Sequence, residues 1–150
     1  MAETHNLLFH LALLGCLLMA SEAFKDHIVG GGKGWRLPQN KTFYNEWSQS
    51  KSFILGDKLV FLFRSGANNL LEVSKEDFDA CTQNNVIQRY HNGPTILELT
   101  EIGEHYYYCG VGIHCEAGQK LSINVTTAAD AAAAAVVEPS SDASFAALMM

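Results

Sequence analysis

The sequence lacks any run of basic residues. Its 150 residues contain 10 Lys and Arg against 16 Asp and Glu, which gives a formal net charge of -6 at pH 7. A surface that binds nucleic acid needs clustered Lys and Arg to neutralise the phosphates. The composition therefore predicts a protein that does not bind nucleic acid.

A long apolar run is also missing, although a shorter one lies near the N-terminus. Residues 7–20 read LLFHLALLGCLLMA, and Ser21 and Ala23 are small residues at the spacing that a signal peptidase requires. A membrane span would need about 20 apolar residues, and this run is shorter. The basic residue typical of a signal peptide's start is absent, since the first Lys or Arg is Lys25. We interpret residues 1–23 as a signal peptide cleaved after Ala23, which predicts a secreted, extracellular protein with no transmembrane segment in its mature chain.

Proline is scarce, with 3 in the chain, and the C-terminal segment offers few large side chains. The composition changes near Thr126, after which the chain reads TAADAAAAAVVEPSSDASFAALMM. We therefore predict one domain over residues 24–126 and an Ala-rich flexible tail over residues 127–150. A lipid-anchor signal would need a terminal apolar stretch of about 10 to 20 residues. Residues 145–150 are too short to support an anchor.

Short runs of β-branched and aromatic residues fill the domain, separated by Gly, Asn, Asp and Ser. Such runs are typical of an all-β sandwich or barrel. Leu121, Ile123 and Val125 alternate with polar residues, which indicates a strand with one face toward the core. A short helix is predicted over residues 74–80, where Ser74 caps the first turn. The predicted strand segments are residues 27–30, 58–63, 69–73, 95–99, 105–109 and 120–125.

Two sequons for N-linked glycosylation occur in the domain. One begins at Asn40 in a polar loop, and the other begins at Asn124 in the last predicted strand. The alternation in that strand places Asn124 on its outer face. We predict that both asparagines carry glycans if the chain is exported.

Cleavage of the signal peptide would remove Cys16 and leave three cysteines, Cys81, Cys109 and Cys115. In an oxidising compartment one of the three must then stay free, pair with another molecule or bind a ligand. A bond between Cys109 and Cys115 would close a ring of six residues and constrain the unfolded chain little. A bond between Cys81 and Cys115 would close a loop of 34 residues, for which the chain-entropy model gives about 4 kcal/mol. The longer loop would stabilise a small sandwich more, but the spacing leaves the pairing open.

A free Cys109 would be followed in sequence by two further donors, His114 and Gln119. A thiolate sulfur, imidazole nitrogens and a weak axial oxygen or thioether form the ligand set of blue copper sites. Gly110 and Gly112 allow the loop to turn tightly enough for the thiol and the imidazole to face one ion. A buried apolar thiol beside a surface histidine is the alternative. An enzyme is not expected, because no third group that would orient a Cys–His pair is evident.

Five stretches along most of the domain match the motifs of one known family. The most specific one is YYYCGVGIHCEAGQKLSINV at residues 106–125. The others are IVGGGKGW at residues 28–35, FYNEW at residues 43–47, GDKLVFLF at residues 56–63 and LEVSKEDFDAC at residues 71–81. Through these stretches the sequence resembles the phytocyanins, the plant branch of the cupredoxins. The resemblance implies a cupredoxin-like Greek-key β-sandwich of two sheets with one or two short helices, and one copper ion near one end.

The resemblance also implies roles for individual residues. Cys109 matches the thiolate ligand of the family, His114 matches an imidazole ligand, and Gln119 matches the axial ligand of the stellacyanin-like subgroup. Cys81 and Cys115 match the family's disulfide. The free thiol would then be the one that binds copper.

One ligand of the family is missing from this sequence. Alignment on residues 71–81 puts Asn68 where the family has its other histidine ligand. An amide oxygen is a harder and weaker donor for copper than an imidazole nitrogen, so we predict a weakened copper site. His27 and His105 are poorly placed to substitute, whereas His91, in the loop QRYHNGPT, stays a candidate.

Two functions are compatible with this pattern. The first is one-electron transfer through a single copper ion, by a monomer that meets an unknown redox partner. The second is a non-redox cell-surface glycoprotein that resembles the early nodulin-like branch, has lost copper and contacts a cell-wall component. That branch carries a Pro-rich tail and a lipid-anchor signal, and this chain has neither in recognisable form. We therefore favour the copper protein.

Overall fold

The computed structural model describes residues 23–136. All of the predicted signal peptide except Ala23, and residues 137–150 of the predicted tail, lie outside the described residues. Within the described part of the chain, no helix has the length and apolar character needed to cross a lipid bilayer.

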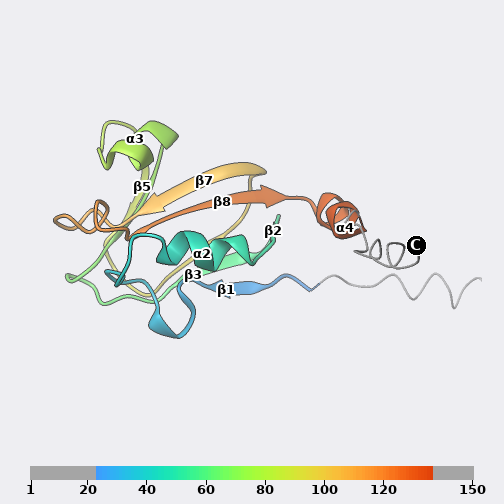
Figure 1. Cartoon of the computed structure of the whole chain (residues 1–150), viewed down its shortest axis with the longest axis horizontal. Helices are drawn as coiled ribbons and strands as arrows, with labels where there is room; N and C mark the ends of the chain where they lie inside the picture. The colour runs from blue at the N-terminus through green and yellow to red at the C-terminus, as the bar shows by residue number, and fades with distance from the viewer. Residues whose placement is uncertain (1–22, 137–150) are drawn as a thin grey trace, which may run out of the picture.

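Two β-sheets face each other and form a sandwich (Figure 1). The strands are β1 (Asp26–Ile28), β2 (Phe53–Ile54), β3 (Lys58–Phe61), β4 (Leu70–Val73), β5 (Val86–Tyr90), β6 (Thr95–Glu98), β7 (Gly103–Tyr108) and β8 (Lys120–Thr126). The smaller sheet has the order β1-β3-β6, with β1 parallel and β6 antiparallel to β3. The larger sheet has the order β2-β8-β7-β4-β5, with β2 parallel to β8 and the other neighbours antiparallel. The predicted all-β sandwich of two sheets is confirmed.

Short helical segments connect or flank the strands. They are η1 (Gly31–Lys33), α2 (Phe43–Gln49), α3 (Lys75–Ala80) and α4 (Ala128–Val136). The predicted helix over residues 74–80 is α3. Ser74 caps it as expected, because its hydroxyl oxygen accepts a hydrogen bond from the Asp77 amide at 3.3 Å.

Several elements were not predicted from the sequence, among them η1, α2, β2 and β5, and α4 lies in the segment predicted as a flexible tail. The helix α2 begins with Phe43 and Tyr44, which are residue types more typical of strands. The strand β5 lies at the edge of the larger sheet and none of its side chains is buried, so its sequence shows no apolar alternation. The strand β2 has only two residues, too few to form a pattern.

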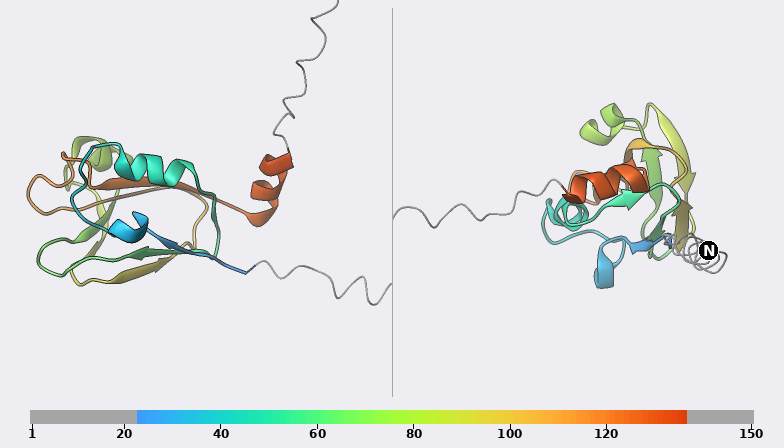
Figure 2. Two further views of the ribbon diagram at one scale, coloured as in Figure 1. Left: turned by 60° about the horizontal axis from the view of Figure 1, so that its bottom comes forward. Right: turned by 90° about the vertical axis from the view of Figure 1, so that its right-hand side faces the viewer.

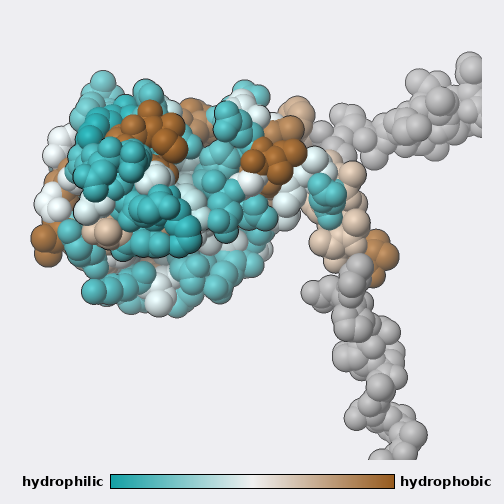
Figure 3. Space-filling view, turned by 90° about the horizontal axis from the view of Figure 1, so that it is seen from above, coloured by the Kyte–Doolittle hydropathy of each residue, from teal (hydrophilic) through white to brown (hydrophobic). Residues whose placement is uncertain are grey.

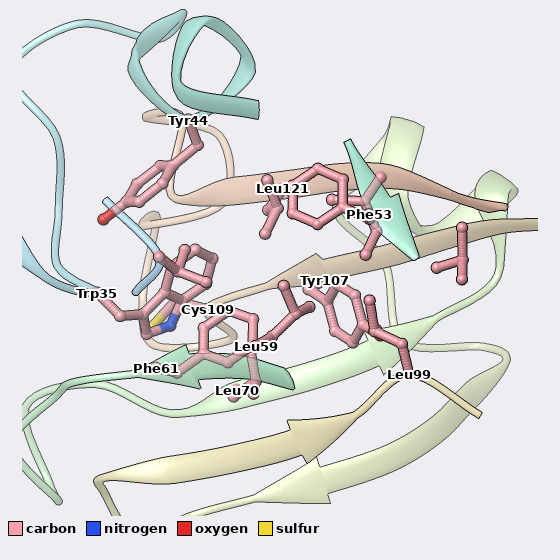
Figure 4. Close-up of a cluster of buried hydrophobic side chains, with 13 residues drawn as sticks. Trp35, Tyr44, Phe53, Leu59, Phe61, Leu70, Leu99, Tyr107, Cys109 and Leu121 are labelled. Atoms are coloured by element: carbon pink, nitrogen blue, oxygen red, sulfur yellow. The ribbon is translucent and has the colours of Figure 1, made fainter. Parts of the chain in front are cut away.

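The main core lies between the two sheets (Figure 4). In β8, Leu121, Ile123 and Val125 are buried while Asn124 is exposed, which confirms the predicted alternation. Figure 4 shows Trp35 and Cys109 at one end of this cluster and Leu99 at the other. The buried members are Val29, Trp35, Tyr44, Phe53, Leu59, Phe61, Leu70, Leu99, Tyr107, Cys109, Leu121, Ile123 and Val125. Removal of this apolar surface from water is the main stabilisation of the sandwich.

A second, smaller core lies between the outer face of the larger sheet and α3. Its buried members are Leu71, Val73, Tyr108 and Cys115, and Phe78 of α3 packs against them. A disulfide joins Cys81, at the C-terminal end of α3, to Cys115, with 5.8 Å between the two Cα atoms. The pairing implied by the resemblance is therefore confirmed, and it ties α3 to the loop that follows β7.

The surface seen in Figure 3 is mostly hydrophilic, with hydrophobic residues in separate places. Helix α4 projects beyond one end of the sandwich (Figure 2), and none of its residues is buried. The loop that joins β7 to β8 lies at the opposite end (Figure 1). Any site on that loop is therefore remote from α4.

Deletion of residues 127–150 should leave the thermal unfolding midpoint almost unchanged, because α4 contributes no buried residue. Circular dichroism melting curves of the full and truncated proteins test this expectation. A fall of more than about 8 °C, equivalent to at least about 1 kcal/mol in a domain of this size, would show that the segment docks on the sandwich. Leu121→Ala, which empties a fully buried position, is the positive control and should cost about 2–5 kcal/mol.

Candidate metal centre

Cys109 follows β7 and lies in the main core. Its side chain is 0% exposed, and among residues 23–136 it is the free cysteine. Its amide donates a hydrogen bond to the carbonyl oxygen of Gln119 at 3.0 Å. The chain between them therefore leaves β7 and returns to β8 at neighbouring points of one sheet, next to the buried sulfur.

The loop of residues 110–118 brings His114 back toward Cys109. The His114 amide donates to the carbonyl of Val111 at 3.0 Å. Gly112 adopts a positive φ of 50°, which glycine tolerates without a steric penalty. These turns place Nδ1 of His114 3.4 Å from Sγ of Cys109. Since transition-metal bonds are about 2.3 Å to sulfur and about 2.0 Å to nitrogen, two donors at this separation can share one ion.

The loop between β3 and β4 places two asparagines, Asn68 and Asn69, beside Cys109. The Asn69 amide donates to Sγ of Cys109 at 3.5 Å, and Oδ1 of Asn69 accepts from the Gly110 amide at 2.7 Å. The Asn69 carbonyl also accepts from the indole N–H of Trp35 at 2.9 Å. Oδ1 of Asn68 lies 4.0 Å from Sγ of Cys109. The structure thus brings Asn68 beside the thiol, while Asn69 fixes the loop that carries it.

Asn69 is not among the site residues that the sequence predicted. Its only signal in the sequence is its position next to Asn68, just before a strand. The bond that gives it a role joins residues 40 positions apart in the chain. No local pattern reports such a contact.

Gln119 completes the group. It is 0% exposed, and its Nε2 donates a hydrogen bond to Oδ1 of Asn68 at 3.0 Å. Its Oε1 has no hydrogen-bond partner, and it is the one buried side-chain nitrogen or oxygen of the described residues in that condition. An unpaired buried polar group costs about 1–3 kcal/mol. A metal ion bound next to Oε1 of Gln119 would give this buried oxygen the partner that it lacks.

We call Cys109, His114, Asn68 and Gln119 the candidate centre. A thiol, an imidazole nitrogen and an unpartnered carbonyl oxygen, all from the connection between β7 and β8, match the donor types of a copper site. The described residues therefore fit copper at three positions and offer a weaker donor, an amide, at the fourth.

The other histidines of the described chain lie outside the candidate centre. His27 pairs with Asp57 at 2.8 Å, and His105 pairs with Glu72 at 3.3 Å. His91 is exposed in the loop after β5. Residues 23–136 contain no group of three or more His, Cys, Asp and Glu side chains that could hold a metal ion. None of these histidines therefore adds a third strong donor to the candidate centre.

Burial raises the pKa of the Cys109 thiol above its ordinary value, and the backbone hydrogen bonds from Asn69 and Val111 oppose that rise only in part. The metal-free thiol is consequently protonated at neutral pH. Metals bind the thiolate form, so metal uptake at this site would release the thiol proton.

The two sequon asparagines are both exposed. Oδ1 of Asn40 accepts hydrogen bonds from the amide and the hydroxyl of Thr42 in the turn before α2. Asn124 lies on β8, opposite Glu104 of β7. Glycosylation at either position stays a prediction, and the exposure of both side chains is compatible with it.

The profile of the plastocyanin-like domain matches residues 35–119, which is more than half of the chain. The chain belongs to the phytocyanin family. Cucumber peeling cupredoxin from Cucumis sativus is 45% identical to it over 106 residues, which cover 68% of this phytocyanin and 76% of that protein. Early nodulin-like protein 14 from Arabidopsis thaliana is 35% identical over 119 residues, which cover 77% of this phytocyanin and 65% of the relative. This phytocyanin thus spans slightly less than two thirds of the latter protein.

Among solved structures, cucumber stellacyanin with Cu²⁺ at pH 7.0 superposes with a TM-score of 0.63 and 44% sequence identity. The match covers 70% of this phytocyanin and 97% of the cucumber chain. The phytocyanin therefore has the cupredoxin fold, as its sequence predicted. Proteins of this family are electron carriers and not enzymes in the usual sense.

The state of the cysteines gives a prediction for the phytocyanin without residues 1–23. In denaturant it should show one reactive thiol per chain, and in the folded, metal-free state that thiol should react at least about tenfold more slowly, because Cys109 is buried and protonated. Titration with a disulfide reagent measures both rates. The rate for the folded protein should rise with pH, because the thiolate is the reacting form.

Cys109→Ser is the control and should leave no reactive thiol. Peptide mapping of the non-reduced protein should recover Cys81 linked to Cys115. A peptide that links Cys109 to Cys115 would contradict both the pairing and the candidate centre.

Proposed function

We propose that this phytocyanin is a secreted one-electron carrier whose copper ion is held by Cys109, His114 and Gln119. The observation that supports this proposal most strongly is the convergence of two strong donors with an orphaned oxygen. Sγ of Cys109 lies 3.4 Å from Nδ1 of His114, and Oε1 of Gln119 is buried without a partner. Bound copper would supply a Cu(II)/Cu(I) couple.

The chain's own residues account for the other requirements of electron transfer. Cys109 and Gln119 are fully buried, which keeps water from the inner side of the centre, whereas His114 is half-buried and gives an edge through which an electron can pass to a partner. The disulfide at Cys115 and the hydrogen bond from Asn69 hold the loops in one arrangement. Little rearrangement on a change of charge favours fast transfer.

Secretion is supported by three features of the chain. Residues 7–20 are an apolar segment typical of a signal peptide. A disulfide is expected in an oxidising, extracellular compartment, and one joins Cys81 to Cys115. Both sequon asparagines are exposed. We propose an extracellular protein that exchanges electrons with a redox partner still to be identified.

A second candidate function rests on Asn68. The position of the missing histidine ligand carries a neutral amide, and one relative is an early nodulin-like protein with 35% identity. The alternative is a non-redox cell-surface glycoprotein in which copper binding has been lost and the sandwich contacts a cell-wall component.

Copper stoichiometry separates the two candidates. The purified protein, loaded with copper under reducing conditions and then desalted, should retain one copper per chain by elemental analysis. His114→Gln should weaken binding by at least about 10 to 100-fold, because a strong donor is lost. His91→Gln, which alters an exposed histidine outside the candidate centre, is the matched control and should bind copper as the native protein does. Native protein without retained copper would favour the glycoprotein.

A further inference from the structure

We infer that the candidate centre holds Cu(I) in strong preference to Cu(II), because Asn68 leaves it with two strong donors in largely buried surroundings that contain no second anionic side chain. This inference rests on the proposed function and specifies which oxidation state the site stabilises. It predicts a carrier that rests in the reduced state.

The donor count comes from contacts around Cys109. The thiol and the His114 imidazole are the two strong donors, and in residues 23–136 no third His, Cys, Asp or Glu joins them. Asn68 is the side chain from the β3–β4 loop that reaches the thiol, with Oδ1 at 4.0 Å from Sγ.

Asn68 also forms a hydrogen bond with Gln119. Its Oδ1 accepts the hydrogen bond from Nε2 of Gln119 at 3.0 Å. This bond orients the Gln119 amide and leaves Oε1 of Gln119 as the free oxygen. Asn68 is therefore a positioning residue for Gln119, and the centre gains little from it as a donor.

The lack of a third strong donor affects the binding of Cu(I) and of Cu(II) unequally. Cu(I) is a soft ion with a filled d shell, which thiolate ligands select and which tolerates few donors. Cu(II) favours tetragonal sets of nitrogen and oxygen donors, so the absence of an imidazole weakens Cu(II) binding more than Cu(I) binding. An imidazole at position 68 would supply the missing nitrogen donor and strengthen Cu(II) binding.

The charge balance around the Cys109 thiol also favours Cu(I) over Cu(II). Cys109 and Gln119 are 0% exposed, and the side chains within reach of the thiol, Asn68 and His114, include no carboxylate, ammonium or guanidinium group. A thiolate with Cu(I) has no net charge, whereas a thiolate with Cu(II) carries one positive charge. Because an uncompensated buried charge is costly, the candidate centre favours Cu(I). Reduction of the bound ion takes one electron from a reductant such as ascorbate and breaks no bond of the protein.

The test compares the native protein with Asn68→His and with Ala67→His. Ala67 is the exposed neighbour of Asn68, so Ala67→His adds an imidazole to the same loop outside the centre. Dissociation constants for Cu(I) are measured anaerobically with ascorbate and the chelator bicinchoninate, and those for Cu(II) by competition with glycine. The native protein and Ala67→His should both show a Cu(II)/Cu(I) ratio of dissociation constants at least about tenfold larger than that of Asn68→His. Since tenfold corresponds to 59 mV for one electron, Asn68→His should lower the reduction potential by at least that amount.

Equal ratios in the native protein and Asn68→His would overturn the inference while the proposed function stands. A native protein that binds copper in neither state would overturn both. If Asn68→His does not fold, the native protein loaded with Cu(I) provides the second measurement. It should keep its copper and stay colourless in air, whereas the prompt appearance of an intense copper-thiolate absorption would overturn the inference.

Discussion

The hydrogen bond from the Cys109 amide to the Gln119 carbonyl, 3.0 Å long, closes the loop that carries the candidate centre. It joins the end of β7 to the start of β8, so that both ends of the loop are fixed by the same sheet. The Gln119 amide then donates to the His114 carbonyl at 2.9 Å, which turns the loop inward. Because these are backbone bonds, the thiol and the imidazole are positioned before any metal binds.

Two cores support this loop from opposite sides. On the inner side, Cys109 is part of the main core beside Trp35 (Figure 4). The indole N–H of Trp35 donates a hydrogen bond to the Asn69 carbonyl. On the outer side, Cys115 belongs to the smaller core and is bonded to Cys81 at the end of α3. His114 lies between these two anchors in sequence. Changes in either core are therefore expected to alter the distance between the thiol and the imidazole.

Much of this arrangement could be predicted from the sequence, and the limits have physical causes. The apolar alternation of Leu121, Ile123 and Val125 reports burial directly, so β8 was predicted correctly. The edge strand β5 buries too little to leave such a pattern. The motif around Cys109 predicted which residues gather, but the bond between Gln119 and Asn68 spans 51 positions and left no local signal. That bond decides which oxygen of the centre is free.

We propose above all that Cys109, His114 and Gln119 together hold one copper ion. A crystal structure of the copper-loaded protein, with anomalous scattering recorded at the copper absorption edge, tests this claim most directly. We expect one strong peak about 2.0–2.3 Å from Sγ of Cys109 and Nδ1 of His114, with Oε1 of Gln119 directed toward it. A strong peak at His91 or His27 with the Cys109 thiol unbound would contradict this assignment of the copper ligands.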